Sequence, residues 1–279
     1  MTGIQRTPSV WIVKVYTVHL AVSTHHLPFS TQNAGRVMTS KNTPQIRNRR
    51  TKWAVPVALI VLSLIPVIAG AARLTELTGG ANVTPQNARF FASPIPVVTH
   101  IVTVTVYSLL GAFQFAPTLR RVSPPRRGRQ SWHQMAGRIL VPAGLLAGLS
   151  GLWMSMFYAL PEGDGEALLV LRLIFGSAMV ASIIMGLFAI RRRDYATHGA
   201  WMTRAYAIAL GAGTQAFVFL SWMLVAGPTD EATRAVLMGA SWVINLTVAE
   251  YFIQRRRRST GRFHEEPRVT RRRREFSST

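Results

Sequence analysis

Six long uncharged stretches, separated by short polar segments, dominate the hydropathy pattern of the chain. A helix crosses a membrane core about 30 Å thick with about 20 apolar residues, and each stretch is about that long. They cover residues 53–72, 94–116, 139–160, 167–190, 200–226 and 235–254. The pattern predicts an all-α fold, a polytopic transmembrane helix bundle with six spans.

Positive charge gathers at alternate junctions between these stretches. Arginine-rich segments occupy residues 47–52, 120–129, 191–193 and 255–258, whereas the opposite junctions hold most of the acidic residues. Because Lys and Arg in short loops stay in the cytoplasm, we expect a multi-pass protein of the plasma (cytoplasmic) membrane. An even number of crossings then leaves the N-terminus and the C-terminus in the cytoplasm.

Composition narrows the possible functions. The net charge of +21 would suit nucleic acid, but the arginines lie in loops and form no nucleic-acid module, so we expect no nucleic-acid partner. The chain has no cysteine, which removes thiolate metal sites and covalent haem attachment. No nucleophile and base with an oxyanion site can be assembled from the sequence, so we assign no catalytic residue and do not expect an enzyme.

The two ends of the chain differ from the middle. Residues 1–46 contain an apolar run that is too short for a span and is interrupted by Lys14 and His19, and we interpret them as a disordered tail or a mis-assigned start, with Met38 as the alternative. Residues 47–254 form the transmembrane domain. Residues 255–279 form a basic cytoplasmic tail, which membrane lipids of negative charge would attract.

Small residues in the third and fifth spans predict close helix packing. The third span carries Gly144 and Gly148 at GxxxG spacing, and the fifth carries Ala205, Ala209 and Gly213. Small side chains let helix backbones approach each other in lipid. We therefore expect both helices to pack centrally. A His followed by an Arg five or six residues later stands at the start of both spans, which suggests two similar helical hairpins and a four-helix core made of spans two to five.

Ionisable groups near the spans are the candidate functional residues, because charge in a membrane is costly. At the inner ends of the third and fifth spans, His133 is followed by Arg138 and His198 by Arg204. Two imidazoles on different helices of a bundle can ligate one haem iron, with arginines pairing its propionates. The leading hypothesis is a membrane redox protein that holds one haem b between His133 and His198. His100, toward the outer end of the second span, is a further cofactor-binding candidate.

Other interpretations of the same residues stay open. His and Arg near helix ends also reach headgroups or loop carbonyls, and Arg172 can reach Glu162, Asp164 or Glu166. A basic inner pocket would equally suit a transporter or carrier for a lipid or a small anionic solute. A non-catalytic accessory subunit needs no cofactor. Candidate partners are membrane lipids, a quinone or another membrane redox partner, and a second copy of the chain in a homo-oligomer.

Three groups of residues between Pro96 and Phe219 resemble those of a known family. They are His100 with residues 111–115, the segment from Trp132 to Arg138, and the segment 191–194 with His198, Trp201, Met202 and Arg204. In this combination the chain resembles the family of membrane proteins with the domain of unknown function DUF2306. Family members carry Arg directly after each inner histidine, whereas this chain has Gln134 and Gly199. The resemblance implies a multi-pass membrane domain of unassigned activity.

Overall fold

The computed structural model describes residues 53–116 and 131–262, with side chains as far as Arg258. Within these ranges every regular element is a helix and none is a strand. The predicted N-terminal tail and the part of the basic tail beyond Arg262 lie outside the described residues. The chain divides into two units, residues 1–46 and 47–279, and all described helices belong to the second.

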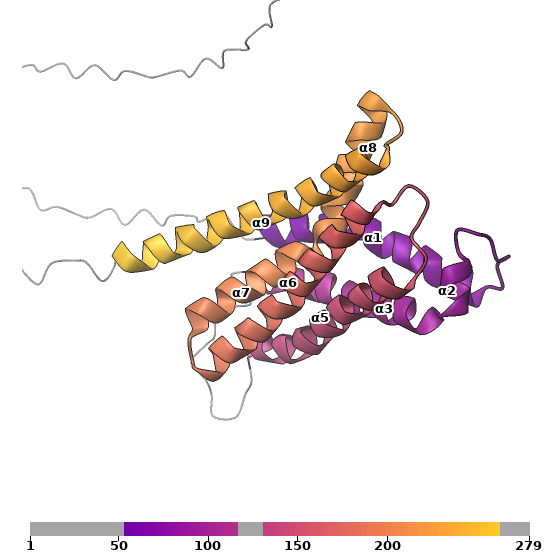
Figure 1. Ribbon diagram of the computed structural model, residues 1–279. Coiled ribbons are helices and arrows are strands. Elements are labelled where there is room, and N and C mark those ends of the chain that lie inside the picture. Colours follow the sequence, from indigo (N-terminus) through magenta and orange to yellow (C-terminus); the bar gives the residue numbers. More distant parts are fainter. Residues whose placement is uncertain (1–52, 117–130, 263–279) are drawn as a thin grey trace, which may run out of the picture. The chain divides into compact units, whose positions relative to one another are not determined.

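Eight helices are described in that unit (Figure 1). They are α1 (Ala54–Thr78), α2 (Ala88–Ala92), α3 (Pro94–Phe113), α5 (Trp132–Phe157), α6 (Glu166–Arg191), α7 (Tyr195–Ala209), α8 (Gly211–Ala226) and α9 (Glu231–Arg262). By length and composition five of them, α1, α3, α5, α6 and α9, can cross a membrane, and α7 with α8 can form a sixth, bent span. The predicted all-α polytopic bundle is confirmed.

The centre of the bundle is a ring of four helices. In this ring α3 packs on α5, α5 on α6, α6 on α7, and α7 again on α3. Their shared core includes Tyr107, Leu140, Met179, Ile183 and Tyr206. The four-helix core predicted from spans two to five is therefore confirmed, and α5 and α7 lie diagonally across it.

Small residues make the close packing of this core possible, as the sequence predicted. Gly144 and Gly148 of α5 are buried. A Cβ atom added to Gly144 would lie 2.6 Å from Cε2 of Tyr107 and 2.9 Å from Cδ1 of Ile183, well inside contact distance. Ala205 of α7 is fully buried in the same core.

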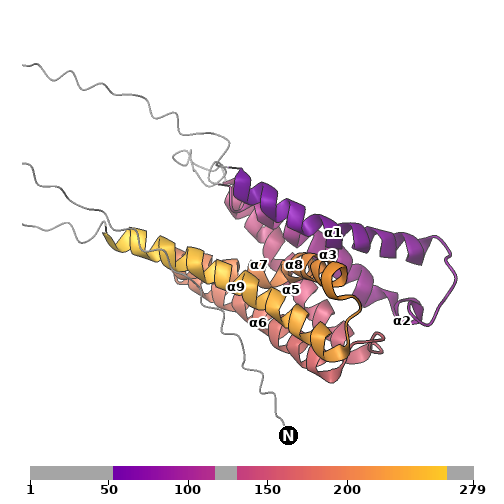
Figure 2. The same cartoon turned by 90° about the horizontal axis from the view of Figure 1, so that it is seen from above.

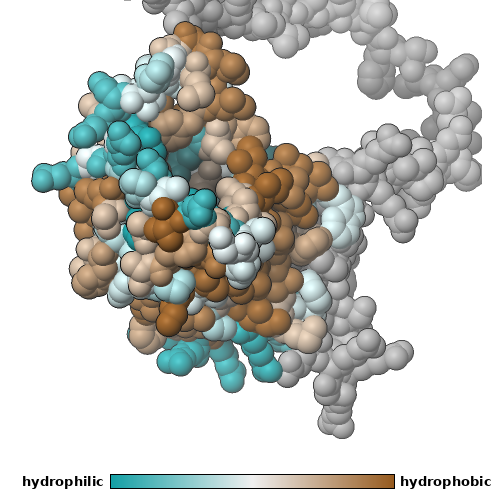
Figure 3. Space-filling view, turned by 90° about the vertical axis from the view of Figure 1, so that its right-hand side faces the viewer, coloured by the Kyte–Doolittle hydropathy of each residue, from teal (hydrophilic) through white to brown (hydrophobic). Residues whose placement is uncertain are grey.

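The remaining long helices surround the core. The first, α1, packs on α3 and α8, and the last, α9, packs on α6, α7 and α8, which Figure 2 shows from above. Large apolar side chains are exposed along α1, α8 and α9, such as Ile68, Leu224 and Val236. Hydrophobic residues cover much of the face in Figure 3. Such a surface is stable in lipid and would be unstable in water.

The sequence predicts one continuous helix over residues 200–226 for the fifth span, but the structure divides it into two helices. The helix begins at Tyr195 and breaks at Leu210, where α7 and α8 meet at an angle of 40°. A side chain from α9 bridges the break: Asn245 donates from Nδ2 to the Ala207 carbonyl oxygen at 3.1 Å and accepts from Thr214 Oγ1 at 2.8 Å. A neighbouring helix thus supplies polar partners at the break, as backbone in lipid requires.

A proline inside α1, Pro66, lies beside this break. Pro66 has no N–H group and cannot donate to the Leu62 carbonyl within α1. At that carbonyl α8 comes so close that a Cβ atom on Gly213 would collide with the Leu62 oxygen. Only a glycine at position 213 lets the α8 backbone approach α1 this closely. The segment of α1 around Pro66 therefore packs against the break between α7 and α8.

Three other helices extend beyond the predicted spans. α1 continues past Arg73 to Thr78, and α9 runs through the arginine segment to Arg262. α5 begins at Trp132 because Ser131 and Gln134 form a reciprocal capping box. The candidate residues His133 and Arg138 consequently belong to the first two turns of a helix rather than to a loop.

Candidate functional site

The candidate inner residues lie at one end of the bundle, where α5 and α7 begin and α6 ends. We call it the arginine end, after Arg191–Arg193. Asp194 forms the N-cap of α7 and accepts from the Thr197 backbone N–H at 2.9 Å. This hydrogen bond is the main cause that lowers the pKa of Asp194 below its ordinary value. The cap places His198 in the first turn of α7.

The imidazole of His198 has a defined orientation. Its Nδ1 lies 2.9 Å from the carbonyl oxygen of Gly186 on α6, and the residue is half-buried. A carbonyl oxygen can only accept, so Nδ1 carries a proton, and in the neutral imidazole the lone pair then lies on Nε2. Histidines that bind metals in proteins are commonly held in this way.

His133 lies in the first turn of α5, and its side chain is exposed. The diagonal helices α5 and α7 thus carry His133 and His198 in their first turns at the same end of the bundle. Arg138 lies between one and two turns further along α5 and is also exposed.

Arg204 has a partner that the sequence analysis missed. Its guanidinium forms a two-point contact with the Glu250 carboxylate of α9, through Nε with Oε1 and through Nη2 with Oε2 at 3.1 Å. It also lies over the Trp201 ring, 4.6 Å from the centroid. The sequence signal was present, because Glu250 is the one acidic residue within the predicted sixth span.

His100 belongs to a different level of the bundle. Its Nδ1 lies 2.9 Å from the carbonyl oxygen of Ala147 and 3.3 Å from Ser150 Oγ, both on α5. Ala147 follows His133 by about 21 Å along the helix, at 1.5 Å a residue. The structure therefore does not bring His100 together with the histidines of the arginine end.

The opposite end of the bundle, where α6 and α9 begin, has its own charge cluster. We call it the acidic end. The carboxylate of Asp164, fully buried in the loop before α6, lies 2.5 Å from Nη2 of Arg172 and 2.7 Å from Nε of Arg234. Asp164 is one of the three partners considered for Arg172. The Arg234 contact is a charge contact rather than an aligned hydrogen bond, because Nε and Oδ1 lack hydrogen-bond geometry.

Further arginines crowd the acidic end. Arg73 and Arg89 both lie over the Phe90 ring, 4.5 and 4.7 Å from its centroid. Burial, followed by repulsion from Arg73, lowers the pKa of Arg89, while attraction to Asp164 opposes that shift.

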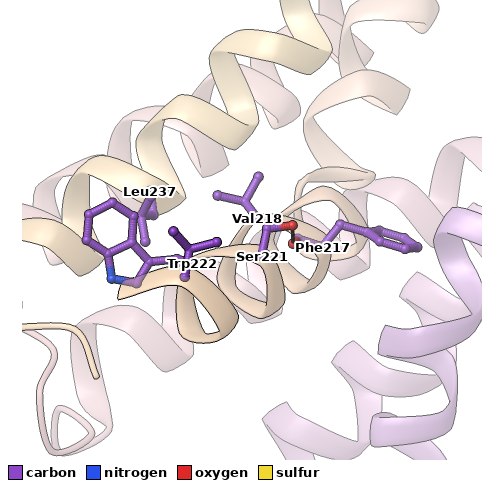
Figure 4. Close-up of a pocket in the computed structure, with 6 residues that line it drawn as sticks. Phe217, Val218, Ser221, Trp222 and Leu237 are labelled. Carbon is purple, nitrogen blue, oxygen red and sulfur yellow. Dashed lines mark hydrogen bonds between the residues drawn. The ribbon is translucent and has the colours of Figure 1, made fainter. Parts of the chain in front are cut away.

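Two hollows accompany these clusters. The larger, of about 420 Å³, is an open apolar groove between α8 and α9 (Figure 4). It is lined by Phe217, Val218, Ser221, Trp222, Val225 and Leu237. The smaller, of about 20 Å³, lies at the break after α7 beside Ser63 and Ser108, and has room for one water molecule.

Among the described side chains, no three metal-binding groups of the His, Cys, Asp and Glu types come together. A haem iron held by two histidines does not need such a cluster. The candidate pair His133 and His198 is therefore neither supported nor opposed by this observation.

Comparison with known proteins identifies a family. The family model described as "Predicted membrane protein (DUF2306)" matches residues 97–253, more than half of the chain. The match extends beyond Phe219, where the resemblance in the sequence ends, and includes Asn245 and Glu250 of α9. Comparisons with curated proteins and with solved structures each gave no match.

Proposed function

We propose that this chain, which belongs to the DUF2306 family of predicted membrane proteins, is a redox protein that binds one b-type haem at the arginine end. His133 and His198 would ligate the iron. The chain is a multi-pass membrane protein of unassigned activity. Haem binding would give the histidines and arginines of the arginine end a common chemical role.

The orientation of His198 carries the proposal. Its Nδ1 donates to the Gly186 carbonyl, 2.9 Å away, so the unprotonated Nε2 is the nitrogen that an iron would bind. His100 makes the same kind of contact, so what distinguishes His198 is its position in the first turn of α7, at the same end of the bundle as His133.

The placement of the second ligand supports the same site. His133 begins the helix diagonally opposite α7, and bundle cofactors are commonly held by side chains from facing helices. Arg138 is the first candidate partner for a propionate, because it is exposed on α5. Arg204 already shares its charge with Glu250 and would be the weaker propionate partner. Electrons would be exchanged with a quinone or another membrane redox partner.

Absorbance of the purified protein tests the proposal. Protein produced with ample haem is expected to show a Soret band and, after dithionite reduction, an α-band. His133→Ala and His198→Ala should each remove the six-coordinate spectrum, while a His100→Ala control should retain it. The control is matched, since His100 makes the same Nδ1 contact with a carbonyl of a neighbouring helix. A colourless protein, or a spectrum unchanged in the folded double variant, would refute haem ligation at these residues.

The broken fifth span favours a second candidate, a carrier for a lipid or small anionic solute. Discontinuous helices with polar groups at the break are typical of transporters, and here Thr214 and Asn245 meet beside the break. A colourless protein that moves a fluorescent phospholipid or radiolabelled benzoate across vesicles would support this candidate. Transport that is unaffected by Arg138→Gln or Arg204→Gln would argue against a path through the arginine end.

A further inference from the structure

The short turn that joins α6 to α7 at the arginine end (Figure 1) holds an arginine in a backbone conformation that favours glycine. Arg193 has a φ of 61°, and among the described residues no other residue except glycine has a positive φ. Its N–H donates to the Ile190 carbonyl oxygen at 3.0 Å, and the Asp194 N–H donates to the Ala189 carbonyl oxygen at 3.0 Å. In this Schellman arrangement the residue after the helix is usually glycine. Arginine therefore makes the turn less stable than glycine would.

The ordinary reasons for an arginine at the end of a helix do not require this position. A cation near the C-terminus of α6 interacts favourably with the helix dipole, but Arg191 and Arg192 already supply that charge without a positive φ. The positive-inside rule asks for charge in the loop and does not specify which residue carries it. A surface residue in an unfavourable backbone conformation points instead to a role for its side chain.

The side chain of Arg193 is available to a partner outside the protein. It is exposed, and in the part of the chain that the structure describes it makes no hydrogen bond, ion pair or ring contact. The acidic residue of the turn, Asp194, accepts from the Thr197 N–H at 2.9 Å and caps α7. The guanidinium group of Arg193 thus has five donors free for an anion.

Exposed aromatic residues place this turn at the level of the lipid headgroups. Tyr195 begins α7 two residues after Arg193, and Trp132 begins α5 at the same end of the bundle. Both side chains are exposed, as is that of Trp53, directly before α1. Tryptophan and tyrosine in such positions are typical of the membrane–water interface. The phosphate groups of phospholipids lie at this interface, within reach of a long arginine side chain.

The charge of the turn decides which kind of headgroup fits. Arg191, Arg192 and Arg193 are three consecutive exposed cations. A zwitterionic headgroup would bring its own ammonium group against them, whereas an anionic headgroup brings only negative charge.

We infer that Arg193 binds the phosphate of an anionic phospholipid in the membrane leaflet at the arginine end, through charge-assisted hydrogen bonds from its guanidinium group. The bound lipid offsets the backbone cost of arginine in the turn. This contact goes beyond the proposed haem binding, does not depend on it, and makes no use of His133 or His198.

Thermal unfolding of the detergent-purified full chain separates the role of the side chain from the cost of the backbone. Arg193→Gly should raise the unfolding temperature by about 2–4 °C in lipid-free detergent, because glycine adopts a positive φ without strain. Added phosphatidylglycerol should stabilise the parent protein more than phosphatidylcholine does, and Arg193→Gly should lose this difference. In native mass spectrometry the variant should retain about fivefold less phosphatidylglycerol, as expected for the loss of one arginine at a charged membrane surface.

Two further variants serve as controls. Arg193→Asn removes the charge but keeps a residue that tolerates a positive φ, so it should also lose the preference for phosphatidylglycerol. Arg192→Gln removes the same charge from the neighbouring exposed residue, whose φ of −84° is ordinary, and should keep most of that preference.

Every other outcome would overturn the inference. If Arg193→Gly lowers the unfolding temperature in lipid-free detergent, the side chain stabilises the turn itself. If Arg192→Gln loses the preference as completely as Arg193→Gly does, the lipid responds to net charge and not to Arg193. If inorganic phosphate stabilises the parent protein as much as phosphatidylglycerol does, the partner is a free anion. If Arg193→Gly keeps the lipid preference but loses a protein that co-purifies with the parent chain, the partner is a protein.

Discussion

The two ends of the bundle hold their charges in different ways. At the acidic end Asp164 has a fully buried side chain contacted by two arginines, whereas at the arginine end the side chains of Arg204 and Glu250 are 23% and 37% exposed. Water can replace the partner of an exposed charge but not of a buried one. The buried carboxylate at the acidic end therefore holds helices together, while the arginine end leaves its charged groups partly exposed.

The sharpest test of this difference is Asp164→Ala. Removing the carboxylate leaves Arg172 and Arg234 without their shared partner, and breaking a buried ion pair costs about 3–5 kcal/mol. Thermal unfolding in detergent should show a large loss of stability. Glu162→Ala is the matched control, because Glu162 lies exposed in the same loop. Equal stability of the two variants would mean that the acidic end is not held by its buried carboxylate.

Gly213→Ala tests how tightly α8 packs against α1 at the break, which lies between the two ends of the bundle. The added Cβ would collide with the Leu62 carbonyl oxygen, part of the α1 backbone, and overpacking of this kind costs about 1–3 kcal/mol. Gly137→Ala, at the arginine end, has no atom within 4 Å of the added Cβ and should stabilise α5 by up to about 1 kcal/mol. If both variants shift the unfolding temperature in the same direction, α8 does not pack tightly against α1 at Gly213.

Asn245→Leu should have a smaller effect at the same break. It removes the donor to the Ala207 carbonyl and the acceptor for Thr214, and interhelical hydrogen bonds in membranes contribute about 0.6–1.7 kcal/mol. Thr247→Val serves as the control, since Thr247 Oγ1 bonds only to Val243 of its own helix and is exposed. If the two variants unfold at the same temperature, Asn245 does not stabilise the break.

The smallest effect is expected for Glu250→Gln at the arginine end. Because both partners are partly exposed, the pair should contribute about 1 kcal/mol or less, and the difference from the parent protein should shrink in high salt. If Glu250→Gln lowers the stability as much as Asp164→Ala does, the two ends of the bundle do not differ in how they hold their charges.

Three features of the structure show which contacts the sequence could predict and which it could not. The sequence offered Arg172 three acidic partners, and the loop conformation before α6 selected Asp164. The partner of Arg204 was Glu250, more than forty residues away in the sequence, which no local pattern connects. The break at Leu210 was not predicted, because glycines such as Gly211 and Gly213 are common in unbroken spans and the residue that bridges the break, Asn245, lies on another helix.

The polytopic helical bundle and its four-helix core could be predicted from the sequence alone, because the apolar length that crosses a membrane, the spacing of small residues and the repeated His–Arg pattern are properties of each segment. Tertiary structure decided where a span breaks, which tautomer His198 adopts and which charges are buried. These features depend on atoms that neighbouring helices bring within about 3 Å, and a one-dimensional pattern of apolar and polar residues contains no such distances.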